Sequence, residues 1–242
     1  MSMRHIDIPA PGGTIPAQIF GAGPPVLFLM DAPGVRPVLV SMCQRIAASG
    51  HTVLLPNLYW RWCRESALDR CEFEKPDSAE RTRIFGMANG LTNAMFAEDL
   101  PALLDAMGAT PDNPAGAVGY CMSGRFAMMA LANHPDRVRV AASYYGTRMV
   151  LDTPDSPHLW YPKMQQGHAY LAFAQDDHYV PLDRLPIIRA ALQQGGLSHE
   201  IEVYPRTTHG FAFPDSRGYD APGEARHWET LLPLMRRLTC SS

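Results

Sequence analysis

The sequence predicts an α/β fold in which a mostly parallel, doubly wound sheet is flanked by helices. Short apolar runs alternate with longer segments of helical character along the 242 residues. The middle runs are apolar throughout, as expected for strands that are covered on both faces. Because no internal repeat, low-complexity tract or long linker divides the sequence, we expect a single domain over residues 1–242.

The apolar runs place the expected strands at Thr14–Phe20, Pro25–Met30, Thr52–Pro56, Ala115–Tyr120, Val138–Tyr145, Ala169–Ala174 and Glu200–Tyr204. Parallel strands need long crossover connections, which are usually helical. The intervening segments supply them at Pro37–Ser49, Ala94–Met107, Ser123–Asn133, Leu182–Gln194 and Glu224–Leu238.

The segment Trp60–Thr92 is polar, aromatic and rich in arginine, and it fits no strand. It follows a predicted strand, so it can overhang the carboxyl edge of the sheet, where ligands bind in open α/β folds. We expect this segment to contribute to a substrate cleft.

The composition excludes several classes of protein. Hydrophobic residues make up 46% and charged residues 19% of the chain, which is typical of a globular protein. The 21 Lys and Arg residues against 24 Asp and Glu give a net charge of −3, so no broad basic surface is expected for nucleic acid. No apolar run approaches the roughly 20 residues of a membrane helix. The amino-terminal residues do not resemble a signal peptide, so we expect a cytoplasmic protein without a membrane partner.

The five cysteines are odd in number and too scattered for a zinc-binding CxxC pair or a disulfide framework; they are Cys43, Cys63, Cys71, Cys121 and Cys240. Reduced thiols are expected.

One of these cysteines lies where a strand ends abruptly and a helix begins. In a nucleophile elbow the nucleophile occupies a strained turn, and small residues on either side let the strand and the helix approach closely. Gly119 stands two residues before Cys121, while Ser123 and Gly124 follow it. Ser123 as nucleophile would need glycines where Cys121 and Arg125 stand, so Cys121 is the better candidate. Taken alone, a cysteine at a strand end is more often a packed apolar residue.

A catalytic cysteine needs a histidine as base and usually a carboxylate that orients the ring. Asp177 follows the predicted strand Ala169–Ala174, and His209 follows the last predicted strand. Asp177 comes 56 residues after Cys121 and His209 a further 32 residues on, which is the chain order of α/β-hydrolases. A metal site formed by Asp176, Asp177, His178 and His209 is the less favoured interpretation of the same residues.

These motifs resemble the dienelactone hydrolase family of the α/β-hydrolase fold, and the resemblance extends along nearly the whole chain. It rests on Gly119-Tyr120-Cys121-Met122-Ser123-Gly124 at the elbow, Asp177-His178-Tyr179-Val180-Pro181 at the acid and His209-Gly210-Phe211 at the histidine. Supporting motifs are Leu55-Pro56-Asn57-Leu58-Tyr59-Trp60-Arg61 and Tyr144-Tyr145-Gly146. Two departures are Asn57, where the family has Asp, and Ser123, where it has Gly.

The resemblance implies a Cys121, His209 and Asp177 triad that needs no metal and no cofactor. It also implies an oxyanion hole formed by the backbone amides of Met122 and Ala32, because Pro33 has no amide hydrogen to donate. Asp31 stands where the archetypal enzyme has a glutamate close to the nucleophile, and its side chain is shorter.

For the substrate, the resemblance points to Phe213 and to the segment Glu80-Arg81-Thr82-Arg83. Archetypal members bind the carboxylate of the lactone partly with an arginine at the position of Phe213. We therefore expect a less anion-selective pocket, in which any remaining preference for anions depends on Arg81 or Arg83. The alternative is that these arginines belong to a solvated helix face.

The sequence as a whole predicts a hydrolase that cleaves a small carboxylic ester or lactone through an acyl-cysteine intermediate, as a monomer or a homodimer. A non-catalytic member of the fold that only binds a small molecule is the main alternative. A thiol peroxidase or redox sensor is less favoured, because no resolving cysteine lies near Cys121 in the sequence.

Overall fold

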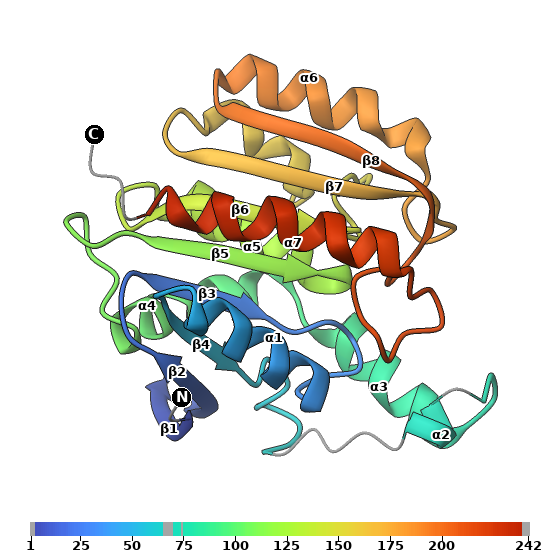
Figure 1. The fold of residues 1–242 in the computed structure, drawn as a ribbon, viewed down its shortest axis with the longest axis horizontal. Coiled ribbons are helices and arrows are strands. Elements are labelled where there is room, and N and C mark those ends of the chain that lie inside the picture. Colours follow the sequence, from blue (N-terminus) through green and yellow to red (C-terminus); the bar gives the residue numbers. More distant parts are fainter. Residues whose placement is uncertain (1–2, 65–69, 74, 239–242) are drawn as a thin grey trace.

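The computed structural model describes residues 3–64, 70–73 and 75–238. Its centre is an eight-stranded sheet with the order β1-β2-β4-β3-β5-β6-β7-β8 (Figure 1). The strands are β1 (Met3–Ala10), β2 (Gly13–Gly21), β3 (Pro25–Leu29), β4 (Thr52–Pro56), β5 (Ala115–Tyr120), β6 (Val138–Tyr144), β7 (His168–Asp176) and β8 (Ser198–Thr208). Strand β2 pairs antiparallel with β1 and β4, and the pairs from β4 through β8 are parallel. The mostly parallel α/β prediction is confirmed.

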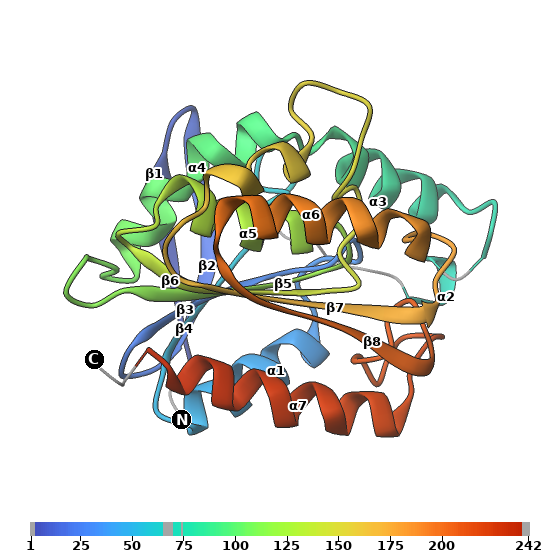
Figure 2. The ribbon, with the colours of Figure 1, turned by 90° about the horizontal axis from the view of Figure 1, so that it is seen from above.

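Helices cover both faces of the sheet. They are α1 (Pro37–Ala48), α2 (Arg70–Phe73), α3 (Ala79–Gly90), α4 (Asn93–Ala106), α5 (Gly124–Asn133), α6 (Leu185–Gly195) and α7 (Ala221–Arg236). Figure 2 shows α1 and α7 on one face and α3, α4, α5 and α6 on the other. No helix in the described ranges is both long and apolar enough to span a bilayer.

The parallel strands bring their carboxyl ends to one edge of the sheet. Every residue of β3 and of β5 is buried, as their continuous apolar sequences predict. Leu29 at the end of β3 pairs with Gly119, and Gly119 pairs with Ser143 of β6. The loops that follow β3, β5, β6, β7 and β8 therefore meet at this edge, although they lie far apart in the sequence.

The first strand, β1, was not among the predicted elements. It forms a hairpin with β2 in which Ala10 pairs with Gly13, and Gly12 has a φ of 84° in the turn. Most of β1 is exposed at the edge of the sheet, so its mixture of polar and apolar residues lacks an apolar run. The Pro11-Gly12 dipeptide is the signal that could have indicated the turn.

Helix α3 lies within the segment Trp60–Thr92, where the sequence pattern predicts no helix or strand. The helix begins after Ser78, whose hydroxyl accepts a hydrogen bond of 3.1 Å from the amide of Arg81. Only Ile84, Met87 and Ala88 of this helix are buried. Because so few of its residues are apolar and buried, the helix has no clear amphipathic pattern in the sequence. The spacing of apolar residues therefore does not predict it.

Candidate active site

Strand β5 delivers Cys121 to the edge of the sheet in a strained conformation. Cys121 has a φ of 54°, in the left-handed region that residues with a side chain rarely adopt. It begins the single turn η1 (Cys121–Ser123), which leads directly into α5. A strained residue that lies between a buried strand and a helix and lines a cavity matches the nucleophile elbow expected from the sequence.

Two glycines make this turn possible. A Cβ atom on Gly119 would lie 2.2 Å from the carbonyl oxygen of Ser123, and one on Gly124 would lie 2.4 Å from Oγ of Ser143. Both distances are too short for non-bonded atoms. The elbow therefore requires glycine at both positions, which lets α5 lie close to β5 and β6.

Ser123 is tied into the elbow as a structural residue. Its side chain is completely buried, and its Oγ accepts a hydrogen bond of 3.0 Å from the amide of Tyr120 and lies 3.0 Å from the carbonyl oxygen of Leu29. The serine that replaces the usual glycine thus connects the elbow to the end of β3. This burial also argues against Ser123 as the nucleophile.

Asp177 and His209 meet at the same edge, from the loops after β7 and β8. Nδ1 of His209 lies 2.7 Å from Oδ2 of Asp177, whose other oxygen accepts a hydrogen bond of 2.9 Å from the amide of Tyr179. The Asp177 side chain is fully buried. With both oxygens engaged, the carboxylate is fixed in place, and it orients the imidazole so that Nε2 faces away from Asp177.

The electrostatic surroundings of His209 favour its charged form. Burial lowers its pKa, but Cys121 and the hydrogen bond to Asp177 outweigh burial and raise the pKa to about 10. Nε2 meets no partner at full hydrogen-bonding geometry in the described part of the chain. Cys121 is nevertheless close enough for a thiolate there to stabilise the imidazolium. The pair can therefore exchange a proton, as nucleophilic catalysis by cysteine requires.

The two residues whose amides are expected to form an oxyanion hole, Ala32 and Met122, also line this cavity. The amide of Met122 is in the first turn of a helix, where no intrahelical acceptor is available. The hydroxyl of Tyr59 donates to the carbonyl of Ala32 at 2.8 Å and lies 3.3 Å from Sδ of Met122. Tyr59 thus links the two segments that carry these amides.

Asp31 lines the cavity but is held by an arginine. Its carboxylate pairs with the guanidinium of Arg36, which also donates through Nε to Asp215 at 2.7 Å. Arg36 thereby joins the loop after β3 to the loop that follows His209. Within the described residues Asp31 makes no hydrogen bond to Cys121, because its short side chain is turned toward Arg36.

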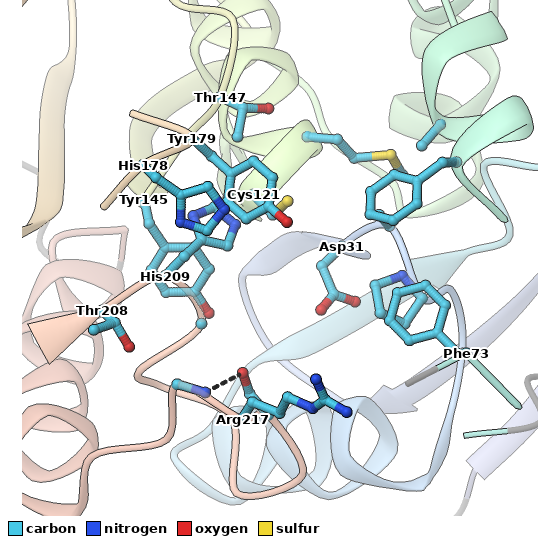
Figure 3. A pocket seen from close by; sticks show the side chains of 18 of the residues that line it. Asp31, Phe73, Cys121, Tyr145, Thr147, His178, Tyr179, Thr208, His209 and Arg217 are labelled. Atoms are coloured by element: carbon cyan, nitrogen blue, oxygen red, sulfur yellow. Dashed lines mark hydrogen bonds between the residues drawn. The ribbon is translucent and has the colours of Figure 1, made fainter. Parts of the chain in front are cut away.

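The cavity has a volume of about 900 Å³ and is lined by residues from the loops and from α3 (Figure 3). Cys121, His209, Asp31 and Tyr145 face it. Helix α3 contributes Arg81, Phe85, Ala88 and Asn89. The expectation that the segment Trp60–Thr92 takes part in a cleft is thus met by this helix.

Of the two arginines expected to contact the substrate, one lies on the cavity. The guanidinium of Arg81 lies over the rings of Phe73 and Phe85, 5.4 Å and 4.9 Å from their centroids. Arg83 is exposed, pairs with Glu80 at 2.8 Å and is not among the lining residues. The expectation for Arg83 is therefore corrected, because residues two positions apart on a helix point to different sides.

The expectation that Phe213 faces the substrate is also corrected. Phe213 is buried and does not line the cavity. Its ring packs 4.7 Å from the ring of Tyr120 and 6.2 Å from that of Tyr145, with the Arg36 guanidinium 5.2 Å from its centroid. The loop after His209 turns inward here, since the amide of Phe213 donates to the carbonyl of Gly210.

We therefore predict that Phe213→Arg destabilises the protein instead of creating an anion site. A second cation would be buried beside Arg36 without a carboxylate of its own, at a cost of about 3–5 kcal/mol in the free energy of unfolding. Phe213→Leu, which keeps the site apolar, is expected to cost about 1–2 kcal/mol. Denaturant unfolding measures both. A stable Phe213→Arg protein with increased activity on carboxylate-bearing lactones would contradict this placement.

The structure also adds cavity-lining residues to which the sequence assigned no role at the site. Tyr145 has a φ of 40°, lines the cavity and buries a hydroxyl that has no hydrogen-bond partner among the described residues. Arg125 and Arg148 line the same cavity. Their positions in the sequence could have indicated them. Tyr145 directly follows β6, and Arg125 stands four residues after Cys121 in an otherwise apolar helix.

The metal interpretation of the acidic and histidine residues finds no geometric support. The described residues contain no group of three or more His, Cys, Asp or Glu side chains arranged to hold a metal ion. Asp177 and His209 instead bond to each other, and Asp176 and His178 are exposed.

Comparison with known proteins places this geometry in context. The model of the dienelactone hydrolase family matches residues 14–239. A protein of Synechocystis sp. named "putative carboxymethylenebutenolidase" is 25% identical over 221 residues, which cover 89% of this chain and 87% of that protein. The carboxymethylenebutenolidase of Rhodococcus opacus is 24% identical over 198 residues, or 79% of this chain and 71% of that protein.

Solved structures agree on the fold. The crystal structure of a "putative dienelactone hydrolase" from Klebsiella pneumoniae superimposes with a TM-score of 0.83 at 21% identity and covers 98% of both chains. A dienelactone hydrolase-like promiscuous phosphotriesterase from metagenomic libraries has a TM-score of 0.73 at 17% identity, again over 98% of both chains. These likenesses confirm the α/β-hydrolase fold.

Proposed function

Because the chain belongs to the dienelactone hydrolase family and is a hydrolase of the ester or lactone type, we propose that it cleaves a small carboxylic ester or lactone through an acyl-cysteine intermediate on Cys121. One observation carries the proposal: strained Cys121 and His209 line the same cavity, and the buried carboxylate of Asp177 is hydrogen-bonded to the histidine ring. The names of the curated relatives support a lactone as substrate.

In the first half-reaction, Nε2 of His209 takes the thiol proton and Sγ of Cys121 attacks the substrate carbonyl. The carbonyl oxygen becomes an oxyanion, which the amides of Met122 and Ala32 stabilise. When the tetrahedral intermediate collapses, the carbon–oxygen bond of the ester breaks. The departing alkoxide receives the proton from His209, and the acyl group remains on sulfur.

In the second half-reaction, His209 takes a proton from water while the water oxygen attacks the acyl carbon. The carbon–sulfur bond breaks, and the proton returns to the sulfur of Cys121. The product is a carboxylate, joined to the released hydroxyl when the substrate is a lactone. Asp177 keeps the imidazole in the required tautomer and stabilises its charged form through both steps.

We further propose that the chain acts as a single domain on a small molecule, without a cofactor. A cytoplasmic location, a monomeric or homodimeric state and the absence of a nucleic-acid partner stay predictions from the sequence. The alternative of a non-catalytic binding protein is disfavoured, because packing alone does not require the strained φ of Cys121.

A substrate panel tests the proposal. Dienelactone, a neutral lactone, an aryl ester and a thioester are offered to the protein, and rapid quenching followed by mass spectrometry searches for an acyl adduct. We expect turnover of at least one compound and an adduct on Cys121.

Thiol labelling provides the matched measurement. Cys121 is expected to react much faster than Cys43, which is buried, and Cys63, which is half-buried. The side chain of Cys71 and all of Cys240 lie outside the described residues. An absence of turnover together with equally slow labelling of Cys121 would favour the binding protein.

A further inference from the structure

Three arginines on the cavity wall have no carboxylate partner within the described residues: Arg81, Arg125 and Arg148. This contrasts with Arg36, on the same cavity, which is neutralised by Asp31 and Asp215. Cations that line a cavity without a counter-ion raise the question of which anion they bind.

Arg125 is the most unusual of the three. Only 3% of its surface is exposed, and it is the second residue of α5, where the positive end of the helix dipole disfavours a cation. One nitrogen, Nη2, donates to the carbonyl of Leu91 at 2.8 Å, while Nε is buried without any partner among the described residues. A buried guanidinium whose N–H group has no acceptor lowers the stability of the protein, unless a ligand accepts that hydrogen bond.

Arg148 adds a second positive charge beside Arg125. It is exposed, has a φ of 57° and donates through Nη2 to Oδ1 of Asn89 at 2.9 Å. Burial and the charge of Arg148 together lower the pKa of Arg125 to about 10. Cys121 and Asp155 offset part of this lowering of the pKa, but Asp155 forms no ion pair with Arg125 in the described part of the chain. An anion between the two arginines would reduce the repulsion between their charges and could accept a hydrogen bond from Nε of Arg125.

We propose that Arg125 and Arg148 form a subsite that binds a carboxylate group of the substrate, so that the preferred ester or lactone carries a negative charge on the α5 side of Cys121. The assignment rests on the proposed function, because it concerns the same cavity. Guanidinium groups offer planar, forked donors that match the two oxygens of a carboxylate. This subsite involves neither Phe213 nor Arg83.

A purely structural role for Arg125 is the competing explanation. Its bond to Leu91 satisfies a carbonyl just past the end of α3, and its guanidinium lies 4.4 Å from the ring centroid of Phe126. That role uses one donor and needs no second arginine at the cavity. Arg148 therefore distinguishes the explanations, since it does not contribute to the bond with Leu91.

The test compares two para-nitrophenyl esters of equal shape: the glutarate monoester, which ends in a carboxylate, and an analogue in which an isopropyl group replaces that carboxylate. Arg125→Met and Arg148→Met are each expected to lower kcat/KM for the glutarate ester by about 30-fold, the usual worth of a charged hydrogen bond. The isopropyl ester should change less than about threefold. Arg189→Met, on the exposed face of α6, is the control and should change neither.

A binding measurement separates this proposal from the hydrolase mechanism. Calorimetry with glutarate and with its neutral diamide is independent of turnover, and we expect glutarate to bind the wild type more tightly and to lose this advantage in both variants. That result would support the subsite even if no ester were cleaved. Equal losses for the two esters, or glutarate binding unchanged in Arg148→Met, would overturn it.

Discussion

Cys121→Ala is expected to abolish ester and lactone hydrolysis, with a loss of up to about a millionfold in kcat. Alanine has no atom that can replace the sulfur as the attacking nucleophile, and His209 then has no thiol proton to accept. Alanine retains the Cβ atom at the same φ of 54°, so the elbow should persist. We expect the free energy of unfolding to change by less than about 1 kcal/mol.

Cys121→Ser gives the graded form of the same experiment. Its oxygen lies close to the position of the sulfur but is much harder to deprotonate, so its rate should fall between those of the wild type and Cys121→Ala. Cys63→Ala is the matched control, because Cys63 is a half-buried thiol that does not line the cavity. Hydrolysis at the wild-type rate by a folded Cys121→Ala protein would exclude the acyl-cysteine mechanism.

The sequence predicted best those features that depend on neighbours along the chain. The elbow is partly such a feature, since a Cβ atom on Gly119 would clash with the backbone of Ser123, four residues away. Gly124 is instead restricted by Ser143 of the next strand and by Gly146, which follows that strand. The positions of Asp177 and His209 followed from the rule that loops after parallel strands meet at one edge. Both residues do lie on loops at that edge.

The less successful predictions concern the direction of side chains outside regular strands. Phe213 is four residues past His209, and counting positions gives no indication that the loop turns its ring inward toward Tyr120. Arg81 and Arg83 lie two residues apart, and only the orientation of α3 toward the cavity distinguishes them. The position of Arg125 in an apolar helix is a local signal, but its hydrogen-bond partner Leu91 lies 34 residues away, and a local pattern does not identify it.

The two adjacent acids, Asp176 and Asp177, provide the sharpest test of the site geometry. Neighbouring residues that leave a strand point to opposite sides, so only one can face His209. Asp176 is the last residue of β7, pairs with Thr208 and is exposed, whereas Asp177 is buried and bonded to His209. Any functional difference between the two carboxylates should follow this difference in direction.

Asp177→Asn is therefore expected to lower kcat by about ten-thousandfold, the size of the effect that the equivalent change has in serine proteases. The amide nitrogen of asparagine would face Nδ1 of His209, so the ring would keep its proton on Nε2 and could not accept one from Cys121. Asp176→Asn changes a charge at the mouth of the cavity only, and steady-state kinetics should show less than about a threefold change. Thermal unfolding of both variants checks that each protein is folded. If Asp176→Asn were the more damaging substitution in folded proteins, Asp176 and not Asp177 would have to face His209. The hydrogen bond between Asp177 and His209 could then not be the one that orients the base.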